Sequence, residues 1–246
     1  SLENFYGFIF RNQEIKGNFN MVSNQFSVDD FMSAGTETKE GEAKPKGELK
    51  IPAYLNCVLN AKANTVLYDN LTLKDVSGKL FIKDQKVVLD NVKTSIFNGL
   101  IGMNGSVSTK EKVPTFSMDL DMKGVDIAQT FTQLDMLKKI APIAGIINGK
   151  INTAIKVSGN LDAKEMTPNL NSISGSLNNQ FLSTTISTAN SDLLKKLGQN
   201  INFIDVNKIN LNDVKTALTF ENGKVKLKPI DLKYQDIKAT ISGEQG

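Results

Sequence analysis

VSGKLFIKDQKVVLDNVKTSIFNGLIGMNG, residues 76–105, contains the alternating pattern that decides the fold of this chain. Apolar side chains recur at about every second position, and KDQ at 83–85 and NG at 98–99 separate the alternating runs. Such runs predict strands with one buried face, joined as antiparallel hairpins. The stretch VKTALTFENGKVKLKPIDLKYQDIKATISG, residues 214–243, aligns with it at a constant offset of 214 − 76 = 138. The chain is therefore built from a repeated β unit.

The two copies share six identical residues and also the phase of their apolar positions. The alternation slips between Leu89 and Val92 in the first copy and between Leu227 and Ile230 in the second. It slips back at Ile101 in the first copy and at Ala239 in the second. A slip of one residue turns side chains to the other face, so slips at equivalent places predict bulges or turns used twice. A short glycine phrase also recurs, centred on Gly17, Gly105, Gly159, Gly175 and Gly243.

Similar alternating segments fill most of the remaining chain. They lie at 5–10, 15–22, 54–63, 65–73, 78–83, 86–96, 100–108, 115–123, 149–161, 172–187 and from 209 to the end. The first two are expected to form a hairpin around residues 11–14. The fold class predicted is mainly β, with a long antiparallel curved sheet that forms a half-open groove or a flattened barrel.

Two helices interrupt this pattern. The longer, at 126–141, is expected to begin with Asp126 as its cap and to end before Pro142, with its apolar face packed on the sheet. The shorter is expected at 191–197, before Gly198. Residues 33–47 are rich in Gly, Glu and Lys and lack apolar periodicity, which predicts a flexible linker and a domain boundary.

The composition excludes several classes of function. The 246 residues include no His and a single Cys, which excludes a Ser-His-Asp triad, a His-paired Cys nucleophile and a His-ligated zinc site. The 29 basic and 26 acidic residues leave a net charge of 29 − 26 = +3, too small to indicate a nucleic-acid partner. No run of apolar residues is long enough to predict a membrane span.

The residues that could carry chemistry have ordinary structural explanations. Asp119 and Asp121 point to one face of a strand, where a solvated surface is the usual meaning and an acid/base pair is the alternative. The glycines between Asn98 and Gly105 lead into a strand and not a helix, so they do not predict a phosphate loop. Cys57 lies in an apolar strand and is predicted to be a small buried hydrophobe. No catalytic, metal-binding or cofactor-binding residue is predicted.

Several phrases of the chain match a known family in order and spacing. They are NAKA at 60–63, VLYDNL at 66–71, DLDMKGVDI at 119–127, LKKIAPIA at 137–144, GKI at 149–151, NGKVKLKP at 222–229 and IKATISG at 237–243. With them, the sequence from about Gly47 onward resembles the C-terminal domain of bacterial AsmA-like proteins, particularly those of Bacteroidetes. The resemblance implies that residues 48–246 are this domain and that residues 1–32 end a preceding β-groove.

The resemblance also implies a place and a role in the cell. Members of this family are periplasmic envelope proteins, held in the inner membrane by an N-terminal helix that would lie outside this chain. They are implicated in phospholipid transport towards the outer membrane and in its integrity. The family has no catalytic motif to transfer.

We therefore expect a non-enzymatic protein whose apolar groove shields phospholipid acyl chains while the headgroups stay in water. The residues expected to face the lipid are Val87, Leu89, Ile101, Met103, Val225, Leu227, Ala239 and Ile241. Ordinary core packing is the alternative for each of them. Two other functions stay open: a docking module that binds an envelope protein through a strand edge, and an enzyme that acts on envelope glycans through Asp119 or Asp121.

Overall fold

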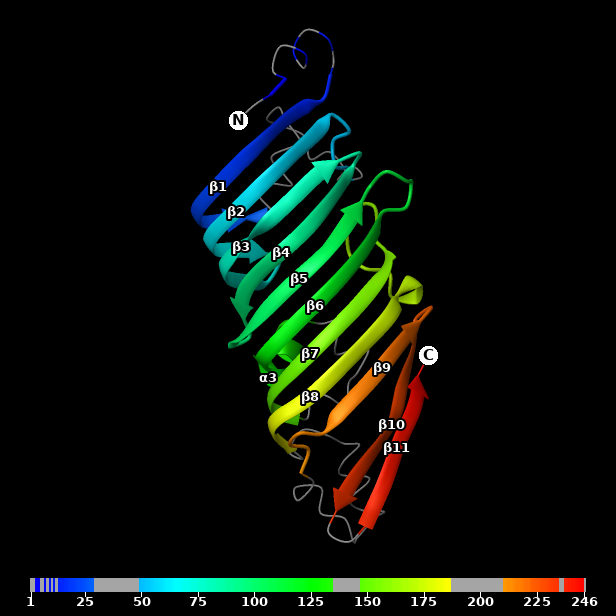
Figure 1. The fold of residues 1–246 in the computed structure, drawn as a ribbon. Coiled ribbons are helices and arrows are strands. Elements are labelled where there is room, and N and C mark those ends of the chain that lie inside the picture. The colour runs from blue at the N-terminus through cyan, green and yellow to red at the C-terminus, as the bar shows by residue number, and fades with distance from the viewer. Residues whose placement is uncertain are drawn as a thin grey trace, which may run out of the picture.

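The computed structural model of the chain describes residues 3, 4, 7, 9, 11, 13–28, 49–134, 147–186, 210–234 and 237–245. Eleven strands form one curved sheet in sequence order, β1 to β11, and the first and last strands are its two edges (Figure 1). The strands are β1 (Ile15–Ser27), β2 (Leu55–Tyr68), β3 (Leu71–Lys83), β4 (Lys86–Ile96), β5 (Gly99–Ser108), β6 (Thr115–Asp126), β7 (Ile147–Asn160), β8 (Ser174–Ile186), β9 (Lys215–Glu221), β10 (Lys224–Tyr234) and β11 (Ile237–Gln245). The prediction of a mainly β fold is confirmed. The curved sheet is half-open and does not close into a barrel.

The first strand departs from the expected hairpin. β1 pairs with β2 in parallel, from Ile15 opposite Leu55 to Ser27 opposite Leu67, whereas all other neighbours are antiparallel. Gly7, Ile9 and Arg11, in and beside the predicted strand 5–10, do not lie in a strand. The hairpin prediction is wrong because alternation marks a strand without showing its partner.

The strands β2 and β3 are longer than the segments predicted for them, and the turn between them lies at residues 69–70. Asn64 was expected to break the pattern but lies inside β2, where its Nδ2 donates to Asn24 Oδ1 of β1 at 3.2 Å. Asp75 adopts a positive φ of 52° at a register shift between β3 and β4. Asn64 and Asp75 are residue types that favour turns, but here Asn64 bonds to the neighbouring strand and Asp75 lies at a bulge.

The internal repeat is confirmed by the register of the strands. Leu80 pairs with Leu89 in the first copy and Leu218 pairs with Leu227 in the second. The β4–β5 register shifts between residues 89 and 92, and the β10–β11 register shifts between residues 227 and 230. Both shifts lie at the offset of 138, so β3–β5 and β9–β11 use the same bulge.

The helix α3 (Ile127–Gln133) begins as predicted, with Asp126 Oδ1 accepting a hydrogen bond from Gln129 N at 2.9 Å. It is shorter than predicted because Leu134 leaves the helical conformation, at φ −110° and ψ 89°, and packs against buried residues of the sheet. Residues 135–141 of the predicted helix, the predicted helix at 191–197 and the predicted linker at 33–47 lie outside the described residues. The domain boundary therefore stays a prediction.

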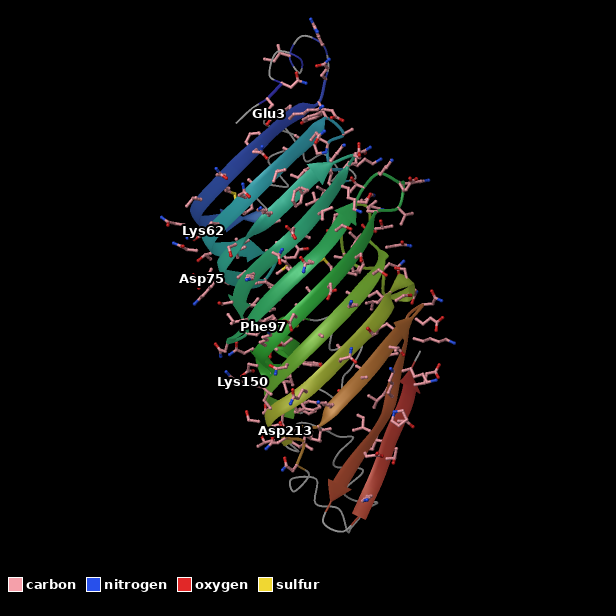
Figure 2. All side chains as sticks on the ribbon, viewed as in Figure 1. Glu3, Lys62, Asp75, Phe97, Lys150 and Asp213 are labelled. Carbon is pink, nitrogen blue, oxygen red and sulfur yellow. The ribbon has the colours of Figure 1, made fainter. Side chains whose placement is uncertain are left out.

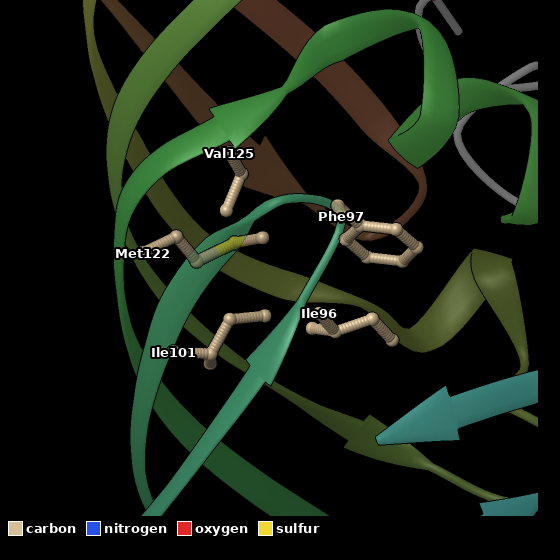
Figure 3. Packing of buried hydrophobic residues seen from close by; sticks show 5 residues of the cluster. All are labelled: Ile96, Phe97, Ile101, Met122 and Val125. Atoms are coloured by element: carbon tan, nitrogen blue, oxygen red, sulfur yellow. The ribbon is translucent and has the colours of Figure 1, made fainter. Parts of the chain in front are cut away.

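The best-buried apolar side chains gather beside this helix. They form a cluster from β4, β5, β6 and the turn between β4 and β5: Ile96, Phe97, Ile101, Met122 and Val125 (Figure 3). Ile127 of α3 is buried as well, with 2% of its surface exposed. The cluster and α3 define one face of the sheet, called the inner face below.

Candidate apolar groove

The inner and outer faces differ sharply in chemistry, as β6 shows. Phe116, Met118, Leu120 and Met122 point to the inner face and are half-buried or buried, while the residues between them are polar and exposed. The outer face, turned to the viewer in Figure 2, carries side chains along every strand. The pleat of the sheet converts a simple alternation into one apolar and one hydrated surface.

A continuous line of apolar side chains crosses the inner face perpendicular to the strands. Each member is the cross-strand partner of the next, from β4 to β10: Val92, Met103, Leu120, Ile155, Leu177, Leu218 and Leu227. We call this set the apolar row. Six steps between strands about 4.8 Å apart make the row about 29 Å long, close to the thickness of a bilayer's hydrocarbon core.

The apolar row is covered at one end and accessible along the rest. Val92 is buried, with 6% of its surface exposed, and Met103, Leu120 and Ile155 pack against the buried cluster. Leu177, Leu218 and Leu227 are half-buried and do not belong to that cluster. The inner face therefore presents half-buried apolar side chains on β8–β10, the part of the candidate groove that the buried cluster does not cover.

A second line of residues runs beside the apolar row, two positions away on each strand and three positions away on β4, where the bulge lies. It consists of Leu89, Gly105, Met118, Val157, Gly175, Phe220 and Val225. All five recurring glycines noted in the sequence lie on the inner face by register. Position 175 requires a glycine, because a Cβ there would lie 2.0 Å from the backbone oxygen of Lys156.

Polar side chains bound the groove on the side of the buried cluster. Thr153 is buried and its Oγ1 donates a hydrogen bond to Asn179 Oδ1 on the next strand. Thr94 is also buried and donates to Lys74 O at 2.9 Å. Because these groups bond within the sheet, they can be buried without a large desolvation cost.

The residues predicted to face lipid fall into two groups on this surface. Val87, Leu89 and Met103 lie on β4 and β5, and Val225 and Leu227 lie on β10, all of them half-buried on the inner face. These two groups are separated by β6–β9, whose apolar residues the sequence reasoning did not select. The alternation in these strands was visible, but which residues become neighbours depends on register.

The other three predicted residues differ in their surroundings. Ile101 belongs to the buried cluster, with 8% of its surface exposed. Ile241, on the edge strand β11, is 47% exposed. Ala239 pairs with Leu232, and its side chain lies outside the described part.

The acidic residues considered for catalysis lie on the outer face. Asp119 Oδ2 lies 3.4 Å from Lys156 Nζ, and Asp121 Oδ2 lies 3.3 Å from Lys123 Nζ. All four side chains are more than half exposed. Such pairs are ordinary surface ion pairs and give no support to an acid/base couple.

Two further predictions concern single features. Cys57 lies on the inner face between Gly17 and Ile82, and it is half-buried where full burial was expected. Burial raises the pKa of its thiol.

The stretch from Asn98 to Gly105 is the expected turn followed by a strand, since Phe97 and Asn98 both have positive φ and β5 begins at Gly99.

Hollows and ligand clusters in the described part of the chain offer no better site. Two shallow hollows of about 190 and 240 Å³ are lined mainly by polar residues of β6–β9, including Asp119 in one and Asn178 in the other. Among the described residues, no group of three His, Cys, Asp or Glu side chains could hold a metal ion. The apolar groove is thus the candidate functional surface.

No family model, no curated protein and no solved structure matches this chain. Within the ranges given above, the structure contains no helix that is long and apolar enough to cross a membrane.

Proposed function

We propose that this chain is a non-enzymatic, AsmA-like module of the bacterial cell envelope that takes part in phospholipid transport between the inner and outer membranes. The observation that carries the proposal is the apolar row, a line of aliphatic side chains that runs across seven strands of a half-open sheet. In this proposal the protein lies in the periplasm and is anchored in the inner membrane.

The mechanism is passive shielding. An acyl chain on the apolar row exchanges contact with water for contact with Leu177, Leu218 and Leu227, while the headgroup stays hydrated at the groove mouth. Each buried methylene contributes about 0.8 kcal/mol, so half-burying ten methylenes contributes about 4 kcal/mol. This affinity is enough to hold a chain and weak enough to let it move on, and it needs no cofactor.

The test is photo-crosslinking in cells with a membrane-anchored full-length version. A photoreactive amino acid replaces Leu177 or Leu227 on the inner face. The matched controls place it at Asn178 or Lys226, the adjacent residues on the same strands, which are exposed on the outer face. We expect phospholipid adducts at the two leucine positions and not at the controls. Equal labelling of both faces, or no lipid at any position, contradicts the proposal.

A second candidate function is a docking module that caps a β-groove. It is favoured by the two edge strands, β1 and β11, each of which has a neighbouring strand on one side only within the described sheet. Adducts from Leu177 and Leu227 to one envelope protein, with no lipid adduct, would support this function instead.

A further inference from the structure

A small apolar group lies on the outer face of the sheet around Phe81. This residue of β3 has 40% of its surface exposed, and its cross-strand partners are Val58 on β2 and Val88 on β4. Cross-strand partners share a face, so all three side chains point outward, where most positions of the sheet are polar. The group is therefore separate from the buried cluster of the inner face.

The internal repeat shows that the fold does not require apolar residues at these positions. At the offset of 138, Thr219 of the second copy corresponds to Phe81, and Lys226 corresponds to Val88. The inner-face residues beside them are the same in both copies: Leu80 and Leu218, Val87 and Val225, and Leu89 and Leu227. The second copy forms the same hairpin with polar residues outside, so the outer apolar group is specific to the first copy.

Exposed lysines surround this group. Lys79 and Lys83 lie two positions on either side of Phe81, on the same face of β3, and Lys86 pairs with Lys83 across the turn. None of these three lysines forms an ion pair with a residue that the structure describes. Their ammonium groups are therefore available to anions outside the chain.

The loop between β5 and β6 adds to the same end of the strands (Figure 1). Thr109 N of this loop donates to Gln85 O at 2.9 Å, and this bond ties the loop to the turn between β3 and β4. Beyond it, Val113 has 51% of its surface exposed, and Lys110 and Lys112 are exposed as well. The turn and the loop thus form one platform with apolar and basic side chains.

We call the exposed residues of this platform the lysine-rich end: Lys79, Phe81, Lys83, Lys86, Lys110, Lys112 and Val113. Three acidic residues lie among them, Asp84, Asp90 and Glu111, and leave a net charge of 5 − 3 = +2. The lysine-rich end therefore complements a negatively charged partner that also accepts single apolar side chains.

This composition fits a bilayer surface better than a protein. The core of a protein interface is a continuous apolar patch, and Lys is depleted from it. Here Phe81 and Val113 lie on separate elements and lysines flank both of them. A second copy docked through the same surface would bring lysines against lysines, which is destabilising. In contrast, aromatic and aliphatic side chains that enter the headgroup region, next to lysines that reach anionic lipids, are typical of membrane-surface contacts.

We propose that the lysine-rich end docks on a bilayer surface that contains anionic phospholipids. Phe81 and Val113 enter the headgroup region, and the lysines contact the phosphates. The apolar row runs across the strands, so docking at the strand ends places one long side of the candidate groove next to the bilayer. The inference rests on the lysine-rich end alone and is independent of what the groove binds.

The first test uses tryptophan as a reporter, because the chain contains no Trp. The Phe81→Trp variant is mixed with vesicles of phosphatidylcholine and phosphatidylglycerol in equal amounts. We expect its emission to shift to shorter wavelength as the indole enters the headgroup region. The Thr219→Trp variant, at the equivalent position of the second copy, is the matched control and is expected to show no shift.

The second test measures vesicle binding by flotation. Each lysine near an anionic surface contributes about fivefold in affinity, so Lys83→Gln combined with Lys86→Gln is expected to weaken binding by about 25-fold. Lys83→Arg combined with Lys86→Arg keeps the charge and is expected to preserve binding. Circular dichroism during thermal unfolding shows whether each variant still folds.

Three results would overturn the proposal. The first is no binding of the chain to the anionic vesicles, or equal binding to vesicles of phosphatidylcholine alone. The second is an equal emission shift at positions 81 and 219, or equal binding of the glutamine and arginine variants. The third is a shift of the Phe81→Trp emission that depends on protein concentration without vesicles, which would identify a second copy as the partner.

Discussion

The turn between β4 and β5 allows a test in which glycine is expected to be better tolerated than alanine. Phe97 has a positive φ of 53°, followed by Asn98 at 55°, the pattern of a type I′ turn. A bulky residue is unusual in this conformation, which costs about 1–2 kcal/mol for a residue with a Cβ. Phe97 is nevertheless buried, with 6% of its surface exposed, and it packs in the buried cluster (Figure 3).

The magnitudes separate the ring from the backbone. Phe97→Ala removes the buried ring and is expected to lower the free energy of unfolding by about 3–5 kcal/mol, while the Cβ keeps the backbone strain. Phe97→Gly removes the same ring and also relieves about 1–2 kcal/mol of strain. The extra chain entropy of glycine takes back about 0.5–1 kcal/mol. We therefore expect the glycine variant to be the more stable of the two by about 0.5–1 kcal/mol.

The assay is urea unfolding followed by far-UV circular dichroism of the three proteins. Phe81→Ala is the matched control, because Phe81 is 40% exposed on the outer face of β3 and is expected to lose far less stability. An alanine variant more stable than the glycine variant would refute the left-handed turn. Equal losses for Phe97→Ala and Phe81→Ala would refute the burial of the ring.

Three other outcomes can be measured on the same material. Asp126→Ala removes the cap of α3 and is expected to cost about 1 kcal/mol in urea unfolding, whereas Asp126→Asn keeps an acceptor and costs less. Hydrogen bonds from the backbone N–H groups of Glu165 and Lys164 lower the pKa of Asp162. The protection of these two amides, measured against the intrinsic exchange rate at each pH, should decrease as pH falls through that lowered pKa, and constant protection would contradict it. Because burial raises the pKa of Cys57, its thiol should react with a disulfide reagent more slowly than free cysteine at neutral pH, until urea unfolds the chain.

The sequence predicted β4–β8 to within a few residues at most ends, because alternation and turn residues act locally. It also predicted the bulge shared by the two repeat copies, since the slip in phase is visible in the apolar residues themselves. The turn at residues 69–70 was missed because Asn64, which resembles a breaker, is used in the ladder with Asn24. The end of α3 was missed because Leu134 leaves the helix to pack on the buried cluster.

The sequence by itself determined the pleat, and with it which side chains share a face: Met118 and Leu120 point one way and Asp119 the other. Only the tertiary structure decided which residues become neighbours, because register joins segments far apart in the chain. Leu120 meets Ile155 and Leu177 meets Leu218 through pairings that no local pattern contains. The tertiary structure also decided that Ile101 is buried while Leu227 lies half open, because burial depends on what packs above a side chain and not on its place in the alternation.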